Sequence, residues 1–386
     1  MDGGIESVTH SLAGEFSRRG YKCLVVYYVE PTGPIDRSGT PFEAQAWFGE
    51  KPDFDIVGFA RDNKAGIVIN NCIRHKAYNA DLLERLSGAG CGVYTVFHAS
   101  PGYELVYLRN KYFCSDNRNL GWRIKKLINI HLRYDSYYRK RRNKLVANHT
   151  EQIKAVDKLV LLSDRYKDKF MTTYDIPEKY RNKLATVSNP LRFPYQAESE
   201  YVAGKEKEVL MVARLEELDK RVSLALTMWA AVERTGRFPD WKFSIVGHGP
   251  DEGRYARMIE EMGLKKVSLE GRRDSLPYYR RASIIVMTSP REGFPMVLPE
   301  AMQNGVVPVV FDTFEALHDI VADGRDGFIV PEGDMDGFAK RVMELMSDEG
   351  MRQEMARSAV AEIGRYTIEN VADRWEELFR MDITEQ

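Results

Sequence analysis

Short apolar runs rich in β-branched residues recur along the second half of the chain, each about as long as one buried strand. Stretches with helical spacing of apolar positions separate them, such as "RVSLALTMWAAVERTG" and "DEGRYARMIEEMG". Because apolar strands that alternate with helices form parallel sheets covered on both faces, this half is predicted to be a doubly wound α/β domain. The predicted strands lie at residues 208–215, 241–249, 266–271, 283–289 and 306–312.

The first half shows the same alternation less regularly. Its predicted strands lie at residues 22–29, 65–71, 91–98, 157–163 and 183–189. A polar segment without periodicity, residues 194–207, separates the two halves and is the predicted linker. We therefore expect an α/β protein of two doubly wound Rossmann-like domains facing each other across a cleft. A ligand is expected in that cleft, at the carboxyl ends of the strands.

Composition agrees with a soluble globular protein, since 44% of the 386 residues are apolar and 29% are charged. A chain of this length usually divides into two domains. Residues 1–200 carry 31 Lys and Arg against 23 Asp and Glu, which gives +8, and residues 201–386 carry 25 against 34, which gives −9. This asymmetry indicates two domains with different partners.

The four cysteines lie far apart, without the spacing of metal ligands or of a redox pair, so no metal site and a reducing cytoplasm are expected. No apolar run approaches the roughly 18 residues of a membrane span. The first residues lack the charged and apolar regions of a signal peptide. A cytoplasmic location is therefore predicted.

The stretch "TSPREGFPMVLPEAM", residues 288–302, joins a predicted strand to a predicted short helix. Backbone amides without helical partners in the turn between them would suit a phosphate. Glu292 on the loop and Glu300 in the helix would face hydroxyl groups of the same ligand, because a carboxylate matches a vicinal diol. A diphosphate between two diols is a sugar nucleotide. The turn residues are Phe294, Pro295, Met296 and Val297.

With this motif, the sequence resembles the retaining glycosyltransferases of family 4, the "glycosyl transferases group 1" type, which have the GT-B fold and an E-x7-E motif. The resemblance implies that Glu292 contacts the transferred sugar and Glu300 the nucleotide ribose. It covers nearly the whole chain, and it implies a first domain over 1–193, a nucleotide-sugar domain over 208–365 and a terminal helix over 366–386 that returns to the first domain.

Other segments fit the same family. "VARLEELDKR" resembles its cationic pair at a strand end, which assigns Arg214 and Lys220 to the donor diphosphate. One residue more than the usual spacing lies between them, so Arg221 is an alternative to Lys220. "IVGHGP" resembles the family's glycine turn beside the nucleotide, with Gly247 and Gly249. On sequence alone, these glycines allow either close approach to a ligand or a tight turn.

In the first domain, "VYTVFHASPG" places His98 after a strand, where the family has a histidine near the transferred sugar; a histidine that caps the turn is the alternative. Gly3 and Gly4 match the family's Gly-Gly loop near the donor phosphates. A strand usually precedes that loop, whereas this chain begins at the loop. Such a strand would be central, so its absence is expected to expose edges on both neighbouring strands.

The resemblance implies transfer of a sugar from a UDP- or GDP-sugar to a glycan or polyprenyl-linked acceptor, with retention, in cell-surface polysaccharide synthesis. No cofactor and no metal are expected, since the chain has no Asp-x-Asp motif and Arg214 and Lys220 balance the diphosphate charge. Two alternatives are a non-catalytic or truncated sugar-nucleotide-binding protein and a sugar-nucleotide epimerase on a related fold.

Residues 109–144 carry 12 Lys and Arg against two acids, with aromatic residues between them. Apolar residues between 124 and 132 fall near helical spacing. One interpretation is docking to an anionic membrane, which would place the protein on the inner face of the membrane beside a lipid-linked acceptor. A solvated helix face is the second interpretation. Binding of nucleic acid, for which no motif is present, is not expected.

Overall fold

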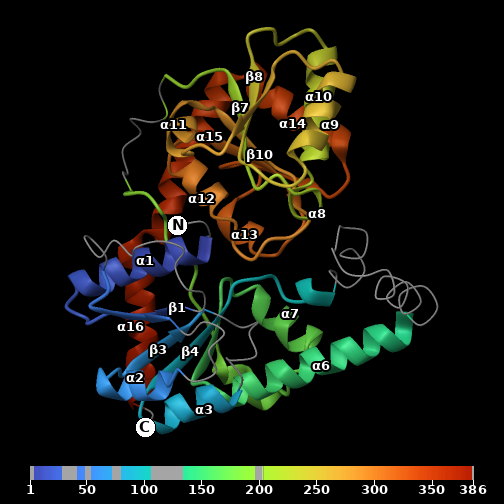
Figure 1. The fold of residues 1–386 in the computed structure, drawn as a ribbon. Coiled ribbons are helices and arrows are strands. Elements are labelled where there is room, and N and C mark those ends of the chain that lie inside the picture. Colours follow the sequence, from blue (N-terminus) through green and yellow to red (C-terminus); the bar gives the residue numbers. More distant parts are fainter. Residues whose placement is uncertain are drawn as a thin grey trace. The chain divides into compact units, whose positions relative to one another are not determined.

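The computed structural model describes residues 4–27, 41–47, 54–71, 80–105, 134–195, 202 and 204–384. The chain divides into two compact domains (Figure 1). One comprises the described residues up to Ser188 together with the helix that begins at Ile368, and the other comprises Asn189–Thr367. Each has parallel strands covered by helices, so the prediction of two Rossmann-like α/β domains is confirmed.

The second domain is built on one continuous sheet of six parallel strands in the order β12-β11-β10-β7-β8-β9. The central strands are buried on both faces, which is why they read as unbroken apolar runs. The strands are β7 (Glu208–Val212), β8 (Lys242–Val246), β9 (Val267–Gly271), β10 (Ile284–Met287), β11 (Val307–Asp312) and β12 (Phe328–Pro331).

Helices lie on both sides of this sheet (Figure 1). Their apolar faces meet the strands in one core, in which Trp229, Phe243, Phe311 and Phe338 are almost fully buried. The helices are α8 (Glu217–Lys220), α9 (Val222–Arg234), α10 (Glu252–Glu261), α11 (Leu276–Arg281), α12 (Val297–Met302), α13 (Leu317–Ile320), α14 (Met335–Ser347), α15 (Glu349–Ile363) and the 3-10 helix η2 (Gly364–Tyr366).

The described strands of the first domain form two parallel sheets, one in the order β3-β4-β5-β6 and one that pairs β1 with β2. The strands are β1 (Leu24–Tyr27), β2 (Ala44–Trp47), β3 (Ile67–Asn70), β4 (Gly92–Phe97), β5 (Lys158–Leu161) and β6 (Leu184–Thr186). The helices are α1 (Gly4–Arg18), α2 (Ile56–Asp62), α3 (Ala80–Gly88), α6 (Tyr134–Ala155), α7 (Tyr166–Thr173) and the 3-10 helix η1 (Glu178–Lys183).

The last helix, α16 (Ile368–Thr384), packs on α1 in the first domain. Arg19, just after α1, donates hydrogen bonds of 2.7 Å to Asp373 and 2.9 Å to the Glu369 carbonyl. The rings of Phe16 and Phe379 lie 6.0 Å apart. These contacts hold the two ends of the described chain together.

All ten predicted strands are present, and the nine whose apolar runs lie wholly within the described residues are shorter than those runs. β2 and β12 were not predicted, because neither shows a long β-branched run: β2 is Ala-Gln-Ala-Trp, and β12 has only three residues before Pro331. The helix expected near residues 124–132 lies outside the described residues. No helix in the described part of the chain is long and apolar enough to cross a membrane.

Candidate active site

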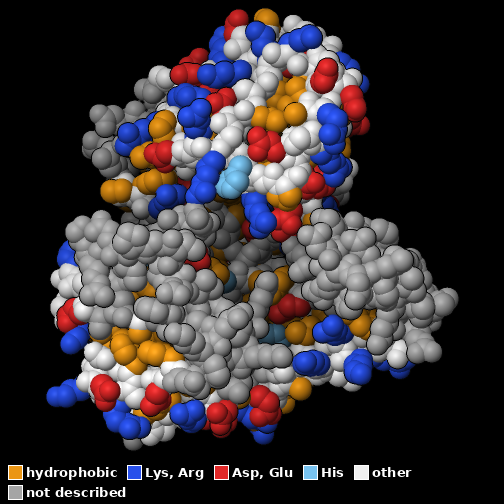
Figure 2. All heavy atoms as spheres, viewed as in Figure 1, with side chains coloured by type: hydrophobic (Ala, Val, Ile, Leu, Met, Phe, Trp, Pro, Cys, Tyr) orange, Lys and Arg blue, Asp and Glu red, His pale blue; other side chains and the backbone are white. Residues whose placement is uncertain are grey.

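Three loops of the second domain follow adjacent strands. Arg214 lies two residues after β7, Gly247 directly follows β8, and Glu292 lies five residues after β10. Since β10, β7 and β8 are parallel neighbours, these loops share the carboxyl edge of the sheet. At this edge of the domain, where Figure 1 labels α8 and α13, Figure 2 shows acidic and basic side chains interspersed.

The glycines after β8 let two loops pack closely together. Gly247 has a φ of +145°, and a Cβ there would lie 1.8 Å from the Ala213 carbonyl oxygen. A Cβ on Gly249 would lie 2.4 Å from the Leu215 carbonyl oxygen. The space beside each glycine is therefore filled by the backbone that follows β7. This packing alone explains why both positions need glycine.

Lys220 and Glu292 meet at this edge. The Lys220 Nζ lies 2.5 Å from Glu292 Oε1, with the lysine side chain 27% exposed and the glutamate side chain 15% exposed. The two side chains come from α8 and from the loop after β10, which are 72 positions apart in the sequence. The E-x7-E loop and the cationic loop therefore form one charged cluster.

The extra residue in the cationic loop is accommodated by Arg221, which adopts a left-handed conformation between α8 and α9. The buried Thr288 hydroxyl lies 2.9 Å from the carbonyl oxygens of both Lys220 and Arg221, which fixes this bend. Arg221 turns to Glu332, at 2.6 Å. Of the two candidate cations, Lys220 is the one beside Glu292.

Arg214 is the most exposed member of the set. Its side chain is 67% exposed, and its Nε lies 3.2 Å from Glu216 Oε2 without the alignment of a hydrogen bond. Such a contact is weak in water. The guanidinium is therefore available to an anionic ligand.

The turn between the two glutamates winds directly into α12. The amides of Leu298 and Glu300 donate to the carbonyls of Pro295 and Met296, at 3.2 and 3.0 Å. The buried Phe294 ring packs edge-on against Tyr366 and anchors the turn. All of the predicted turn residues thus lie at the start of α12, beside the loop that carries Glu292.

Glu300 is the most unusual acid in the second domain. It is only 5% exposed, and burial raises its pKa to about 7. The Tyr279 hydroxyl donates to its Oε2 at 2.9 Å, and no Lys or Arg in the described part of the chain forms an ion pair with it. The charge of Arg192 acts on Glu300 only without a direct ion pair, so burial outweighs it. A buried carboxyl group with a raised pKa is costly to the fold when ionised and is typical of a functional site.

Tyr279 was missed by the sequence analysis. It is fully buried in α11, and burial followed by the charge of Glu300 raises its pKa, so the hydroxyl keeps its proton and can donate it. In "LPYYRRA" it reads as an ordinary core residue. Only the fold brings it against α12.

In the first domain, His98 directly follows β4, and burial lowers its pKa to about 4. Its Nε2 lies 2.8 Å from Asn71 Oδ1. Asn71 directly follows β3, the neighbour of β4, and was also missed by the sequence analysis. Gly4 begins α1, whereas Gly3 lies outside the described residues.

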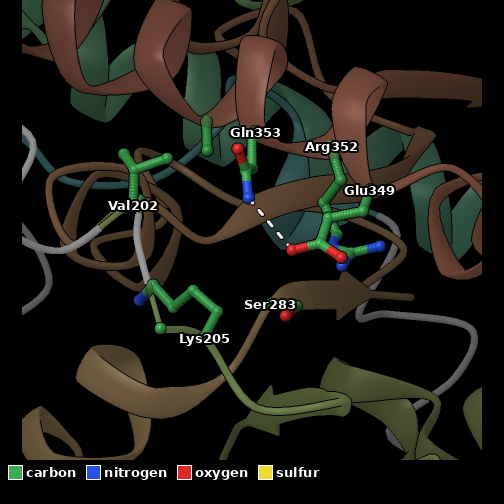
Figure 3. Close-up of a pocket in the computed structure, with 9 residues that line it drawn as sticks. Val202, Lys205, Ser283, Glu349, Arg352 and Gln353 are labelled. Carbon is green, nitrogen blue, oxygen red and sulfur yellow. Dashed lines mark hydrogen bonds between the residues drawn. The ribbon is translucent and has the colours of Figure 1, made fainter.

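The cavity in Figure 3 lies at the opposite edge of the second-domain sheet, since Ser283 and Gly305 precede β10 and β11. It holds about 360 Å³, counting its open mouth. Lys205 donates to three backbone carbonyls, and Gln353 donates to Glu349 at 3.0 Å. Because these groups already bind one another or the backbone, the cavity is not the candidate site.

Residues 196–361 match the family model described as "Glycosyl transferases group 1". The chain is 30% identical over 228 residues to the exopolysaccharide phosphotransferase SCO2592 of Streptomyces coelicolor, covering 58% of this chain and 23% of that protein. It is 26% identical over 228 residues to the amylovoran biosynthesis glycosyltransferase AmsD of Erwinia amylovora, covering 58% and 62%. The matches thus span less than two thirds of either relative.

The fold is similar to that of HepE from Anabaena, solved in complex with UDP and glucose. The TM-score is 0.70 at 16% identity, and the match covers 98% of this chain and 96% of that one. At this identity the likeness establishes the fold alone. The chain therefore has the GT-B fold of glycosyltransferases, and its second domain carries the sequence pattern of group 1 glycosyl transferases.

Proposed function

We propose that this protein is a retaining glycosyltransferase of family 4. It moves one sugar from a UDP- or GDP-sugar to a glycan or polyprenyl-linked acceptor in the synthesis of a cell-surface polysaccharide. The observation that carries the proposal is Glu300, a buried carboxylate held by a tyrosine hydroxyl and paired with no cation among the described residues. A ribose diol would supply the hydrogen bonds that this carboxylate lacks.

The donor is held, in this proposal, by the carboxyl edge of the second domain. Glu300 accepts from the ribose, and Glu292 accepts from hydroxyls of the sugar. Arg214, Lys220 and the backbone amides of Phe294, Met296 and Val297 face the diphosphate; Pro295, which has no amide proton, shapes the turn. Lys220 would leave Glu292 for the phosphates, since a dianion attracts the ammonium group more than one carboxylate does. Glu292 then accepts a hydrogen bond from the sugar.

Gly247 and Gly249 are assigned to the donor site through the loop they shape. Because they let the loops after β7 and β8 pack together, they set the position of Arg214. In the first domain, the proposal assigns His98 to the transferred sugar and Gly3 and Gly4 to the donor phosphates.

The reaction breaks the bond between the anomeric carbon and the diphosphate oxygen. The acceptor oxygen bonds to the same face of the sugar, and the leaving phosphate oxygen takes the acceptor's proton. Charge balance by Arg214 and Lys220 makes the diphosphate a good leaving group without a general acid. Neither a metal nor a cofactor is required by this scheme.

A cytoplasmic protein that docks on the inner face of the membrane fits the basic segment 109–144. Only residues 134–144 of it are described, in the first half of α6. Arg139, Lys140, Arg141 and Lys144 are exposed there, and Figure 2 shows basic side chains along α6. Arg142 is engaged by Asp175, at 2.7 Å. Anionic lipid would attract the exposed charges and bring a lipid-linked acceptor close.

The test is donor turnover with water as the acceptor, followed by proton NMR on UDP-glucose, UDP-galactose, UDP-N-acetylglucosamine and GDP-mannose, with and without EDTA. Release of the sugar first as the anomer present in the donor, undiminished by EDTA, supports a retaining, metal-independent transferase. Release of the opposite anomer contradicts retention. Binding without turnover favours the non-catalytic alternative, and a change of sugar configuration while still bound to UDP favours an epimerase.

A further inference from the structure

Three polar side chains connect three elements of the first domain. Thr9 lies in α1, Asn71 directly after β3, and His98 directly after β4. Asn71 Nδ2 lies 3.1 Å from Thr9 Oγ1, and Asn71 Oδ1 lies 2.8 Å from His98 Nε2. Next to them, Asn70 donates to Thr95 at 3.1 Å, between paired positions of β3 and β4.

The Thr9 hydroxyl determines which atoms donate and which accept in this group. The Thr9 hydroxyl donates to the Ile5 carbonyl at 2.8 Å, so its single proton is committed. Towards Asn71 the hydroxyl can only accept, and the amide must therefore present its NH2 group to Thr9 and its oxygen to His98. With the amide reversed, two acceptors would face each other at 3.1 Å.

Because the amide oxygen of Asn71 can only accept, His98 Nε2 must carry the proton of their hydrogen bond. Burial lowers the pKa of His98 to about 4, so near neutral pH the ring is uncharged and carries only that one proton. The Nδ1 atom then has a bare lone pair. Among the described residues, no group other than Asn71 forms a hydrogen bond with this ring.

We infer that Asn71 is a positioning residue that holds His98 as the Nε2–H tautomer, so that Nδ1 accepts a hydrogen bond from a hydroxyl of the carbohydrate ligand. The ligand part of this inference rests on the proposed function. In this state His98 has no proton to donate to a phosphate or to a leaving group. An anionic oxygen facing Nδ1 would be repelled, which favours a neutral sugar over an acidic one at this position.

The tautomer is tested directly in the ligand-free protein by nitrogen-15 NMR of the imidazole groups at pH 7. A His98→Gln variant identifies the signals of His98 among the seven histidines. The inference expects a protonated Nε2 and an unprotonated Nδ1. It also expects a mixture of tautomers in Asn71→Leu but not in Asn70→Ala, the neighbouring control whose side chain bonds Thr95. A proton on Nδ1 of the wild-type ring overturns the inference.

The functional part is tested by a double-mutant cycle on UDP-sugar hydrolysis. Asn71→Leu and His98→Gln are each expected to lower kcat about tenfold, the effect of one lost hydrogen bond, with unchanged affinity for UDP. If Asn71 acts through His98, the double variant is no slower than His98→Gln alone. Additive losses contradict the positioning role. If the wild-type protein hydrolyses no UDP-sugar, the proposed function and the ligand part fail together, while the NMR result still decides the tautomer.

Discussion

Glu15 in the first domain and Glu300 in the second are equally buried, at 5% exposure each. Burial would raise the pKa of Glu15, but hydrogen bonds from Arg18 and Arg19 outweigh it and lower that pKa. Glu300 instead accepts one hydrogen bond from a tyrosine hydroxyl, and burial raises its pKa to about 7. The first acid holds α1 beside α16 through Arg19, whereas the second has hydrogen-bonding capacity left for a ligand.

The two domains also differ in how their sheets position the candidate site residues. In the second domain, one continuous sheet sets the loops that carry Arg214, Gly247 and Glu292 side by side. In the described part of the first domain the strands form two sheets, and His98 is held by side-chain hydrogen bonds through Asn71. Backbone topology thus positions the second-domain loops, whereas a few polar side-chain contacts position His98.

The largest effect is expected from the backbone beneath the second-domain site. Gly247→Ala would place a Cβ 1.8 Å from the Ala213 oxygen at a φ of +145°. We expect about 4 kcal/mol of destabilisation from overlap and strain together, measured by urea unfolding. Gly253→Ala, in α10 with open space around it, is the control and should be neutral or slightly stabilising. Equal effects would show that the glycine turn is not required.

Glu300→Gln should stabilise the protein, with a dependence on pH. The folded carboxyl keeps its proton up to about pH 7, whereas the unfolded one loses it near 4.5, so stability falls as pH rises through this window. The variant should match wild type near pH 4 and exceed it at pH 8 by up to about 3 kcal/mol. A variant that is less stable than wild type at pH 8 would show that Glu300 is a structural acid.

Glu15→Gln should destabilise the protein, the opposite of the effect expected for Glu300→Gln. Because the pKa of Glu15 is lowered in the folded state, its stabilisation is present above the ordinary value of 4.5 and is lost as pH falls. Denaturation at pH 7 should show a loss of about 2 kcal/mol, since two guanidinium groups lose a buried partner, and the loss should shrink towards pH 3. A loss that does not change with pH would remove the contrast with Glu300.

The smallest predicted effect is on nucleotide affinity, and it distinguishes Lys220 from the adjacent Arg221. Lys220→Ala should weaken UDP binding about tenfold, because it removes a charged contact to the phosphates. Arg221→Ala is the matched control and should change the affinity little, since Arg221 is directed to Glu332. Calorimetric titration with UDP measures both. A larger loss in Arg221→Ala would reverse the assignment.

The sequence predicts the positions of the strands well, because buried parallel strands appear as apolar runs, and the loops after these runs supply the candidate ligand residues. Glu292 and Glu300 were predicted from the motif in one of these loops. Tyr279, Asn71 and the left-handed Arg221 were not, because their roles depend on residues distant in the sequence. The strand β12 was missed because its apolar run, Phe-Ile-Val, is cut off by Pro331 after three residues.

The most direct test of the donor site compares UDP with 2′,3′-dideoxy-UDP, which lacks the ribose diol, by calorimetric titration at pH 8. The account predicts that wild type binds UDP at least about tenfold more tightly than the dideoxy compound, and that Glu300→Gln binds both equally weakly. Equal affinity of wild type for the two nucleotides, or no binding of either by the folded protein, would contradict the assignment of Glu300 to a nucleotide ribose.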